Sequence, residues 1–72
     1  MEIRLFATLR ENHGSIVDFQ WYEGLDAQAL IGALGFETED VSMFLINGKR
    51  SELDAKIMAS DIIALFPPLG GG

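Results

Sequence analysis

The sequence predicts one small α+β domain, with a single helix packed on one face of a sheet of four to five strands. Apolar and polar residues alternate near the start of the chain, as in half-buried strands, and a β-branched apolar run lies near its end. Between them, residues 27–34 carry apolar side chains at offsets of three and four, the spacing of an amphipathic helix. A chain of 72 residues has room for one domain, and one helix between groups of strands favours an α+β architecture.

The first segment, residues 2–9, alternates with a period of two. One face, expected to point inward, carries Ile3, Leu5, Ala7 and Leu9. The other face carries Arg4, Phe6 and Thr8. Residues 11–14 have the composition of a turn, and a second strand follows with its inward face formed by Val17, Phe19 and Trp21. These two segments are expected to form an antiparallel hairpin.

The helix has recognisable start and stop signals. Asp26 is a suitable N-cap, because its carboxylate can accept a hydrogen bond from a free backbone amide of the first turn. The buried stripe is expected to consist of Ala27, Leu30, Ile31 and Leu34. Gly35 is placed to end the helix in a left-handed conformation. A helix of about ten residues is marginal alone, so it must pack on the sheet.

Three further strands follow the helix. Residues 37–40 are expected to form a solvated loop, and residues 43–46 a third strand whose register leaves open whether Phe44 or Leu45 faces the helix. Asn47 and Gly48 form the strongest hairpin signal in the chain, and residues 49–51 would begin a short return strand. Residues 61–66 are a final strand, which ends at Pro67 and Pro68 because proline cannot donate to a ladder.

The sheet face away from the helix is expected to be exposed and partly apolar. By alternation it carries Phe6 and, from the last strand, Ile62, Ala64 and Phe66. Contiguous apolar surface of this kind more often marks a protein interface than an accident of composition. Phe6 and Phe66 are therefore predicted to anchor a partner, with Ile62 at the margin.

Charge and composition exclude several classes of function. Five basic residues stand against eleven acidic ones, a net charge of −6, and no basic stripe suited to nucleic acid is present. This charge either keeps the domain soluble or attracts it to a basic groove on a protein partner. Without cysteine there is no disulfide, thiolate zinc site or cysteine nucleophile. No leader or membrane-length apolar run is evident, so a soluble, cytoplasmic protein that is monomeric when free is expected.

The polar and charged residues form no catalytic constellation. His13 is the single histidine, in a polar turn, and is expected to be a solvated loop residue and not a metal ligand. The acidic residues are scattered and predict a solvated surface. Lys49, Arg50 and Lys56 could steer a partner or accept a conjugate. No metal site and no bound cofactor are predicted.

The chain ends in three glycines, which divides it into a domain of residues 1–68 and a flexible tail of residues 69–72. A frayed end or a cloning remnant would also explain these glycines. A terminus without side chains can alternatively be threaded through a narrow cleft, ordering only when bound. The group delivered in that way is the carboxylate of Gly72, with Gly71 beside it. That carboxylate would need activation by ATP, and a separate enzyme must supply it, since the chain has no phosphate-binding loop ahead of a helix.

The closing residues carry a resemblance to a known family. Phe66, Pro67, Pro68, Gly71 and Gly72 match the spacing of a Phe-Pro-Pro motif followed by two variable positions, here Leu69 and Gly70, and a diglycine. This segment resembles the end of the MoaD/ThiS family of ubiquitin-like sulfur carriers, and within it most closely the small subunits of molybdopterin synthase. Ile46 with Asn47, and the opening strand with Phe6, are also similar to that family.

The resemblance implies a β-grasp fold, with a mixed sheet and one main helix on one face. It also implies a protein that is not an enzyme but a co-substrate. A ubiquitin-activating-type adenylating enzyme would use ATP on Gly72, and the resulting thiocarboxylate would deliver sulfur to a pterin precursor in the synthase large subunit. Residues 66–70 would then contact these partners.

Two departures from the family leave the pathway open. Residues 35–41 form a shorter segment than is usual, and Gly70 replaces a residue with a side chain. Carriers of the thiamine pathway share the diglycine but usually lack the Pro67 and Pro68 pair. A carrier for thiamine or another pathway, a ubiquitin-like modifier of lysines, and a plain interaction domain therefore remain as alternatives.

Overall fold

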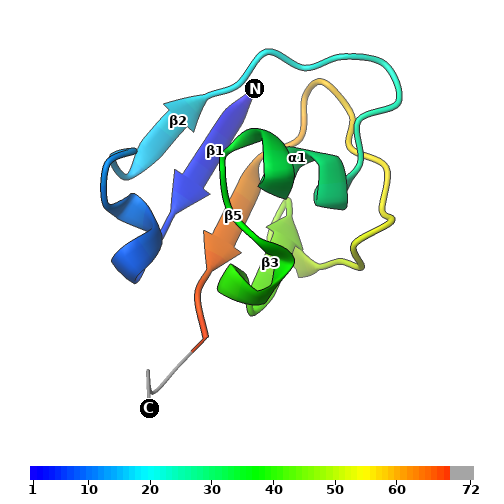
Figure 1. Ribbon diagram of the computed structural model, residues 1–72. Helices are drawn as coiled ribbons and strands as arrows, with labels where there is room; N and C mark the ends of the chain where they lie inside the picture. Colours follow the sequence, from blue (N-terminus) through cyan, green and yellow to red (C-terminus); the bar gives the residue numbers. More distant parts are fainter. Residues whose placement is uncertain (69–72) are drawn as a thin grey trace.

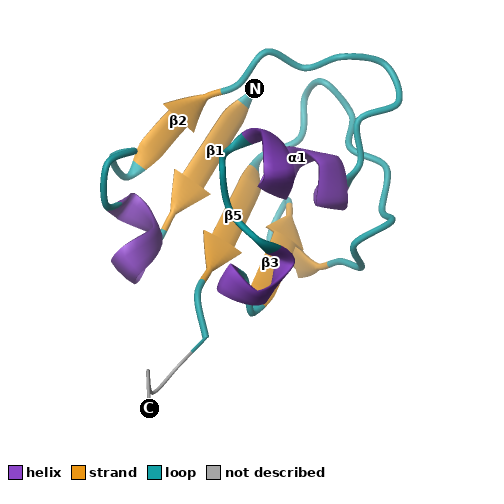
Figure 2. Cartoon of the chain, in the orientation of Figure 1, coloured by secondary structure: helices purple, strands orange, loops and turns teal. Residues whose placement is uncertain are grey.

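In the computed structural model, which describes residues 1–68, five strands form one mixed sheet and a short helix crosses one of its faces (Figure 1). The strands are β1 (Glu2–Leu5), β2 (Ile16–Asp18), β3 (Met43–Ile46), β4 (Lys49–Arg50) and β5 (Ile63–Phe66). The helices are α1 (Ala27–Ala33) and two 3₁₀ turns, η1 (Ala7–Arg10) and η2 (Thr38–Asp40). α1 packs on one face of the sheet (Figure 2). This arrangement confirms the predicted α+β class.

The sheet has the strand order β2-β1-β5-β3-β4, with the first and last strands of the chain side by side at its centre. β1 and β5 run parallel, with Leu5 opposite Leu65, while the other pairings are antiparallel. Parallel neighbours require a long crossover connection, which here contains α1, β3 and β4. This arrangement is the ubiquitin-like β-grasp fold.

The first hairpin forms as predicted, but both of its strands are shorter, since β2 ends at Asp18 before Phe19 and Trp21. β1 ends at Leu5, and the prediction of a strand through Leu9 is wrong. Ala7 adopts a left-handed φ of 54° that breaks the extended backbone and begins η1, so its side chain is exposed instead of pointing inward. The 3₁₀ turn still returns Leu9 to the core. Beyond β2, Phe19 and Trp21 are half-buried against the core, in the predicted direction.

The helix follows its sequence signals closely. The Asp26 carboxylate accepts a hydrogen bond of 2.8 Å from the Ala29 amide, which confirms it as the N-cap. Gly35 follows the helix with a φ of 88°, the left-handed conformation expected of it. The predicted stripe is buried at Ala27, Leu30 and Ile31 and half-buried at Leu34.

Residues 37–40 are more ordered than the predicted loop. They form η2, in which the side chains of Glu37 and Asp40 each accept a hydrogen bond from the other's backbone amide, a reciprocal capping box. The last strand also differs, because it begins at Ile63. Asp61 instead receives hydrogen bonds of 2.8 Å from the Asn47 side-chain amide and from the Met58 backbone.

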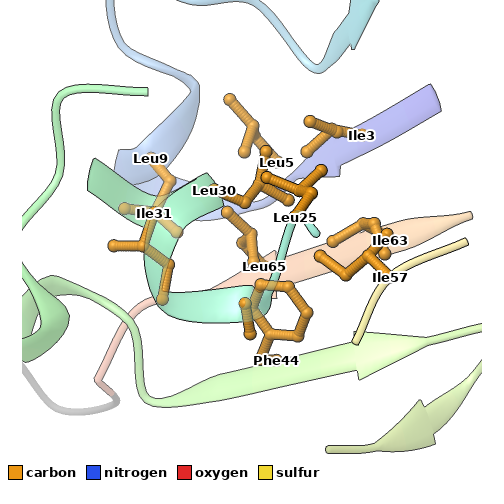
Figure 3. Close-up of a cluster of buried hydrophobic side chains, with 11 residues drawn as sticks. Ile3, Leu5, Leu9, Leu25, Leu30, Ile31, Phe44, Ile57, Ile63 and Leu65 are labelled. Carbon is orange, nitrogen blue, oxygen red and sulfur yellow. The ribbon is translucent and has the colours of Figure 1, made fainter. Parts of the chain in front are cut away.

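The core lies between α1 and the inner face of the sheet (Figure 3). Among residues 1–68 the buried apolar side chains are Ile3, Leu5, Leu9, Leu25, Ala27, Leu30, Ile31, Phe44, Ile57, Ile63 and Leu65. Phe44 is the buried residue of β3, so Phe44 and not Leu45 faces this core, which settles the register that the sequence left open. Of the helices in this part of the chain, none combines the length and apolar composition that crossing a bilayer requires.

Candidate partner-binding face and tail root

The face of the sheet opposite α1, here called the outer face, is partly apolar and is not covered by other elements of residues 1–68 (Figure 2). Buried and less buried residues alternate along β5, so that Ala64 and Phe66 point away from the core. The rings of Phe6 and Phe66 are stacked on each other, with centroids 4.2 Å apart and planes inclined by 7°. Both rings are half-buried, so the pair presents apolar surface to solvent.

The position of Phe6 depends on the pairing of β1 with β5. Its backbone amide donates a 3.2 Å hydrogen bond to the Leu65 carbonyl, which extends the pairing just past the end of β1. The Arg10 guanidinium lies 5.8 Å from the centre of the Phe6 ring, and its Nε donates to the Leu5 carbonyl at 3.2 Å. The turn after Phe6 therefore supports the ring that the partner would meet.

Two residues of β3 add to the apolar surface of the outer face. The sequence analysis did not predict them as part of the site. Met43 lies opposite Phe66 in the ladder, and Leu45 lies opposite Ala64. Residues directly opposite share a face of the sheet, so both side chains join the apolar surface, and both are half-buried. The sequence contains no signal for this, because the register of β3 depends on its pairing with β5.

A groove lies where the chain leaves the sheet. It has a volume of about 1020 Å³ and runs between η1 and the segment before β3. Its apolar lining includes Ala7, Phe36, Met43, Phe66, Pro67 and Pro68. The two prolines, here called the tail root, directly follow β5 and line this groove together with Phe66.

His13 is an exposed turn residue, as the sequence predicts, but its ring also contacts other parts of the chain. Its side chain is exposed, but its ring nitrogens lie 2.9 Å from two carbonyl oxygens, Nδ1 from Glu11 and Nε2 from Leu34. The imidazole also packs on Phe36, with ring centroids 4.8 Å apart. His13 therefore connects the turn after η1 to the end of α1. Within residues 1–68, no group of three or more potential ligands is arranged to hold a metal ion.

The structure brings together most of the predicted partner-binding residues. Phe6 and Phe66 are in contact, and Ile62, which directly precedes β5, has 40% of its surface exposed. Pro67 is half-buried and Pro68 exposed. The remaining predicted site residues, Leu69, Gly70, Gly71 and Gly72, lie outside the described residues.

Comparison with known proteins adds the family. The ThiS family profile matches residues 3–72, which is nearly the whole chain. The chain belongs to the ThiS family. This membership places it among ubiquitin-like sulfur carriers and modifiers, and it confirms the resemblance read from the closing motif. No curated protein matches the chain at a significant level.

Solved structures agree with the fold. SAMP1 from Haloferax volcanii is 29% identical with a TM-score of 0.74, over 99% of this chain and 97% of that one. A second structure, of H. volcanii small archaeal modifier protein 1, is 25% identical with a TM-score of 0.77, covering 94% and 95% of the two chains. A structure described as molybdopterin converting factor subunit 1 from Pyrococcus furiosus is 19% identical, with a TM-score of 0.76 over 94% and 95%. At that identity the last likeness concerns the fold alone.

Proposed function

We propose that this protein of the ThiS family is a sulfur carrier whose Gly72 carboxylate is converted to a thiocarboxylate by partner enzymes. The observation that carries the proposal is the diglycine of Gly71 and Gly72, set at a fixed distance beyond Phe66 in a chain that the family profile matches to its last residue. The protein acts as a co-substrate, and the bond-making groups and ATP site belong to its partners.

The chemistry requires two steps at one carboxylate. An adenylating enzyme transfers the adenylyl group of ATP to the carboxylate, and pyrophosphate leaves. A sulfur nucleophile then attacks the acyl carbon, the bond to the phosphate oxygen breaks, and AMP leaves. The carrier is left with sulfur in place of one oxygen.

The outer face is proposed to dock the enzyme that receives the tail. The aromatic pair borders the tail root, so an enzyme that holds these rings also fixes where the following four residues enter its cleft. Docking of this kind lowers the entropic cost of threading, because one end of the tail is already positioned.

Within the carrier class we propose sulfur delivery for molybdopterin synthesis, as the small subunit of the synthase. The support is the Phe66, Pro67 and Pro68 motif, which resembles those small subunits more than carriers of the thiamine pathway. Cytoplasmic location is part of the same proposal, because synthesis of this kind uses ATP and a second soluble subunit.

A second candidate function is protein modification, in which Gly72 forms isopeptide bonds with lysines. The likeness to SAMP1, described as a small archaeal modifier protein, favours this candidate. The two functions share adenylation and differ in the nucleophile that attacks next.

Intact mass spectrometry separates these candidates. The purified chain is incubated with the adenylating enzyme of its own organism, ATP and a sulfide donor, with omission of ATP as the control. A carrier gains the mass difference between sulfur and oxygen, whereas a modifier forms adducts the size of whole proteins. An unchanged mass under all conditions would leave only the interaction-domain alternative.

The two glycines before Gly72 provide a matched pair of variants. Gly71→Ala is expected to slow thiocarboxylate formation more than Gly70→Ala, because a methyl group next to the reacting residue obstructs a cleft shaped around bare backbone. Gly70 corresponds to a position where the family accepts side chains. Equal rates for the two variants would argue against a narrow cleft at Gly71.

A further inference from the structure

The outer face differs in charge from the chain as a whole. The chain has a net charge of −6, yet all three of its arginines lie on or beside this face. Arg4 points outward from β1, opposite Ala64, and Arg50 points outward from β4, opposite Leu45. Arg10 lies over the Phe6 ring. The apolar centre is thus bordered by guanidinium groups.

The carboxylates on the strands of this face are paired with cations, and one of these pairs also engages Arg4. Among the strand residues that point outward, the acidic ones are Glu2 and Asp18, which lie opposite each other. Glu2 is paired with Arg4, and Asp18 accepts from the Met1 ammonium at 3.2 Å. These ion pairs sit at the β1–β2 end of the sheet, away from the groove.

Arg50 is the arginine best placed to meet a partner. It is exposed, and no carboxylate within the part of the chain that the structure describes forms an ion pair with it. It lines the groove at the tail root together with Phe66 and Pro67, and the lining also includes the acidic residues Glu11, Glu39 and Asp40. Among the charged side chains of this groove, Arg50 is the one that points to the outer face from a strand.

We infer that the enzyme surface that receives the outer face has an apolar centre bordered by carboxylates, at least one of which meets Arg50. This inference rests on the proposed function and adds the chemistry of the docking partner. It runs against the basic groove that the net charge would suggest, because the local charge at the contact decides complementarity.

Lys49 provides a matched control on the same two-residue strand. Lys49 lies opposite Ile46, which packs against the core, so it points to the α1 side while Arg50 points to the outer face. Arg50→Glu and Lys49→Glu change the net charge equally. Binding to the adenylating enzyme is measured without ATP for both variants and the wild type at low and high salt, and pyrophosphate release is measured separately.

Arg50→Glu is expected to weaken binding about tenfold at low salt, with a smaller loss at high salt, whereas Lys49→Glu stays within twofold of wild type. Equal effects of the two variants, or tighter binding by Arg50→Glu, would overturn the inference, as would absence of wild-type binding. Wild-type binding without pyrophosphate release would contradict the proposed function alone, and the two variants would still decide the charge of the partner surface.

Discussion

Leu65 and Phe66 are neighbours in β5, and they show how differently the two faces of this sheet are used. Leu65 points toward α1 and has no exposed surface, while Phe66 points outward, is half-buried and stacks on Phe6. A small domain has one core, and here it lies entirely on the α1 side. The apolar residues of the outer face are thus surplus to the core and available for binding. Substitutions on the two faces should separate folding from recognition.

The largest expected effect is on the inner face. Leu65→Ala removes a fully buried side chain at the centre of the sheet and leaves a cavity, so we expect the free energy of unfolding to fall by about 2–5 kcal/mol. Chemical denaturation monitored by circular dichroism measures this loss. A change below about 1 kcal/mol would mean that the core does not depend on this position.

The next effect is on binding and comes from the outer face. Phe66→Ala and Phe6→Ala each remove one ring of the stacked pair, and each is expected to weaken adenylating-enzyme binding by about 2 kcal/mol, or roughly thirtyfold. Loss of the stacking should cost only about 1 kcal/mol of folding stability. If instead both variants unfold while their residual folded fraction binds normally, the outer face serves the fold and not a partner.

A smaller effect is expected at the hairpin that positions β5 and hence the outer face. Asn47 has a left-handed φ of 53°, and its side chain accepts from the Ile62 amide at 2.9 Å and donates to Asp61. Asn47→Ala should destabilise the domain by about 1–2 kcal/mol, through both backbone strain and lost hydrogen bonds. Asn47→Gly retains the backbone freedom, so it should recover part of this loss. Identical stabilities of the two variants would show that the backbone conformation contributes little.

A similar comparison applies to the link between η1 and α1. His13→Ala should lower stability by about 1 kcal/mol, because it removes both the hydrogen bonding to carbonyl oxygens and the packing on Phe36. His13→Phe retains the ring contact but lacks the nitrogens, so its difference from wild type measures the contribution of the nitrogens. Thermal unfolding of both proteins tests this, and wild-type stability of His13→Ala would contradict the link.

The smallest effect on stability is expected from removing residues 69–72. The described core consists of residues between Ile3 and Leu65, so we expect the midpoint of thermal unfolding to match that of the full chain, while adenylation is lost. A large drop in the midpoint would indicate a structural role for the tail and weaken the carrier proposal. Leu65→Ala should therefore change mainly the stability of the domain, whereas this truncation should change mainly its adenylation.

Most of the regular elements could be predicted from local signals. Asp26 and Gly35 delimit α1, and Asn47 with Gly48 forms the β3–β4 turn, because caps and tight turns depend on residues within a few positions of one another. The errors in the predicted elements and core have a common cause, which is that tertiary contacts and not the local sequence pattern decide these positions. Alternation through Ala7 predicted a longer strand, but β1 loses its pairing there and the chain turns into η1. The core residues Leu25 and Ile57 lie in irregular segments, where no periodicity marks them.

The sequence by itself determined the α+β class, the family motif at the chain's end and the two aromatic residues of the proposed site. The tertiary structure decided which other residues these aromatic side chains contact. Phe6 and Phe66 come from opposite ends of the chain and stack only because β1 and β5 pair in parallel, which no local pattern specifies. A separate antiparallel pairing of β3 with β5 brings Met43 and Leu45 to the outer face, and the pairing of β4 with β3 brings Arg50 there. Such neighbours depend on which strands share backbone hydrogen bonds, and strand pairing depends on the packing of the whole core.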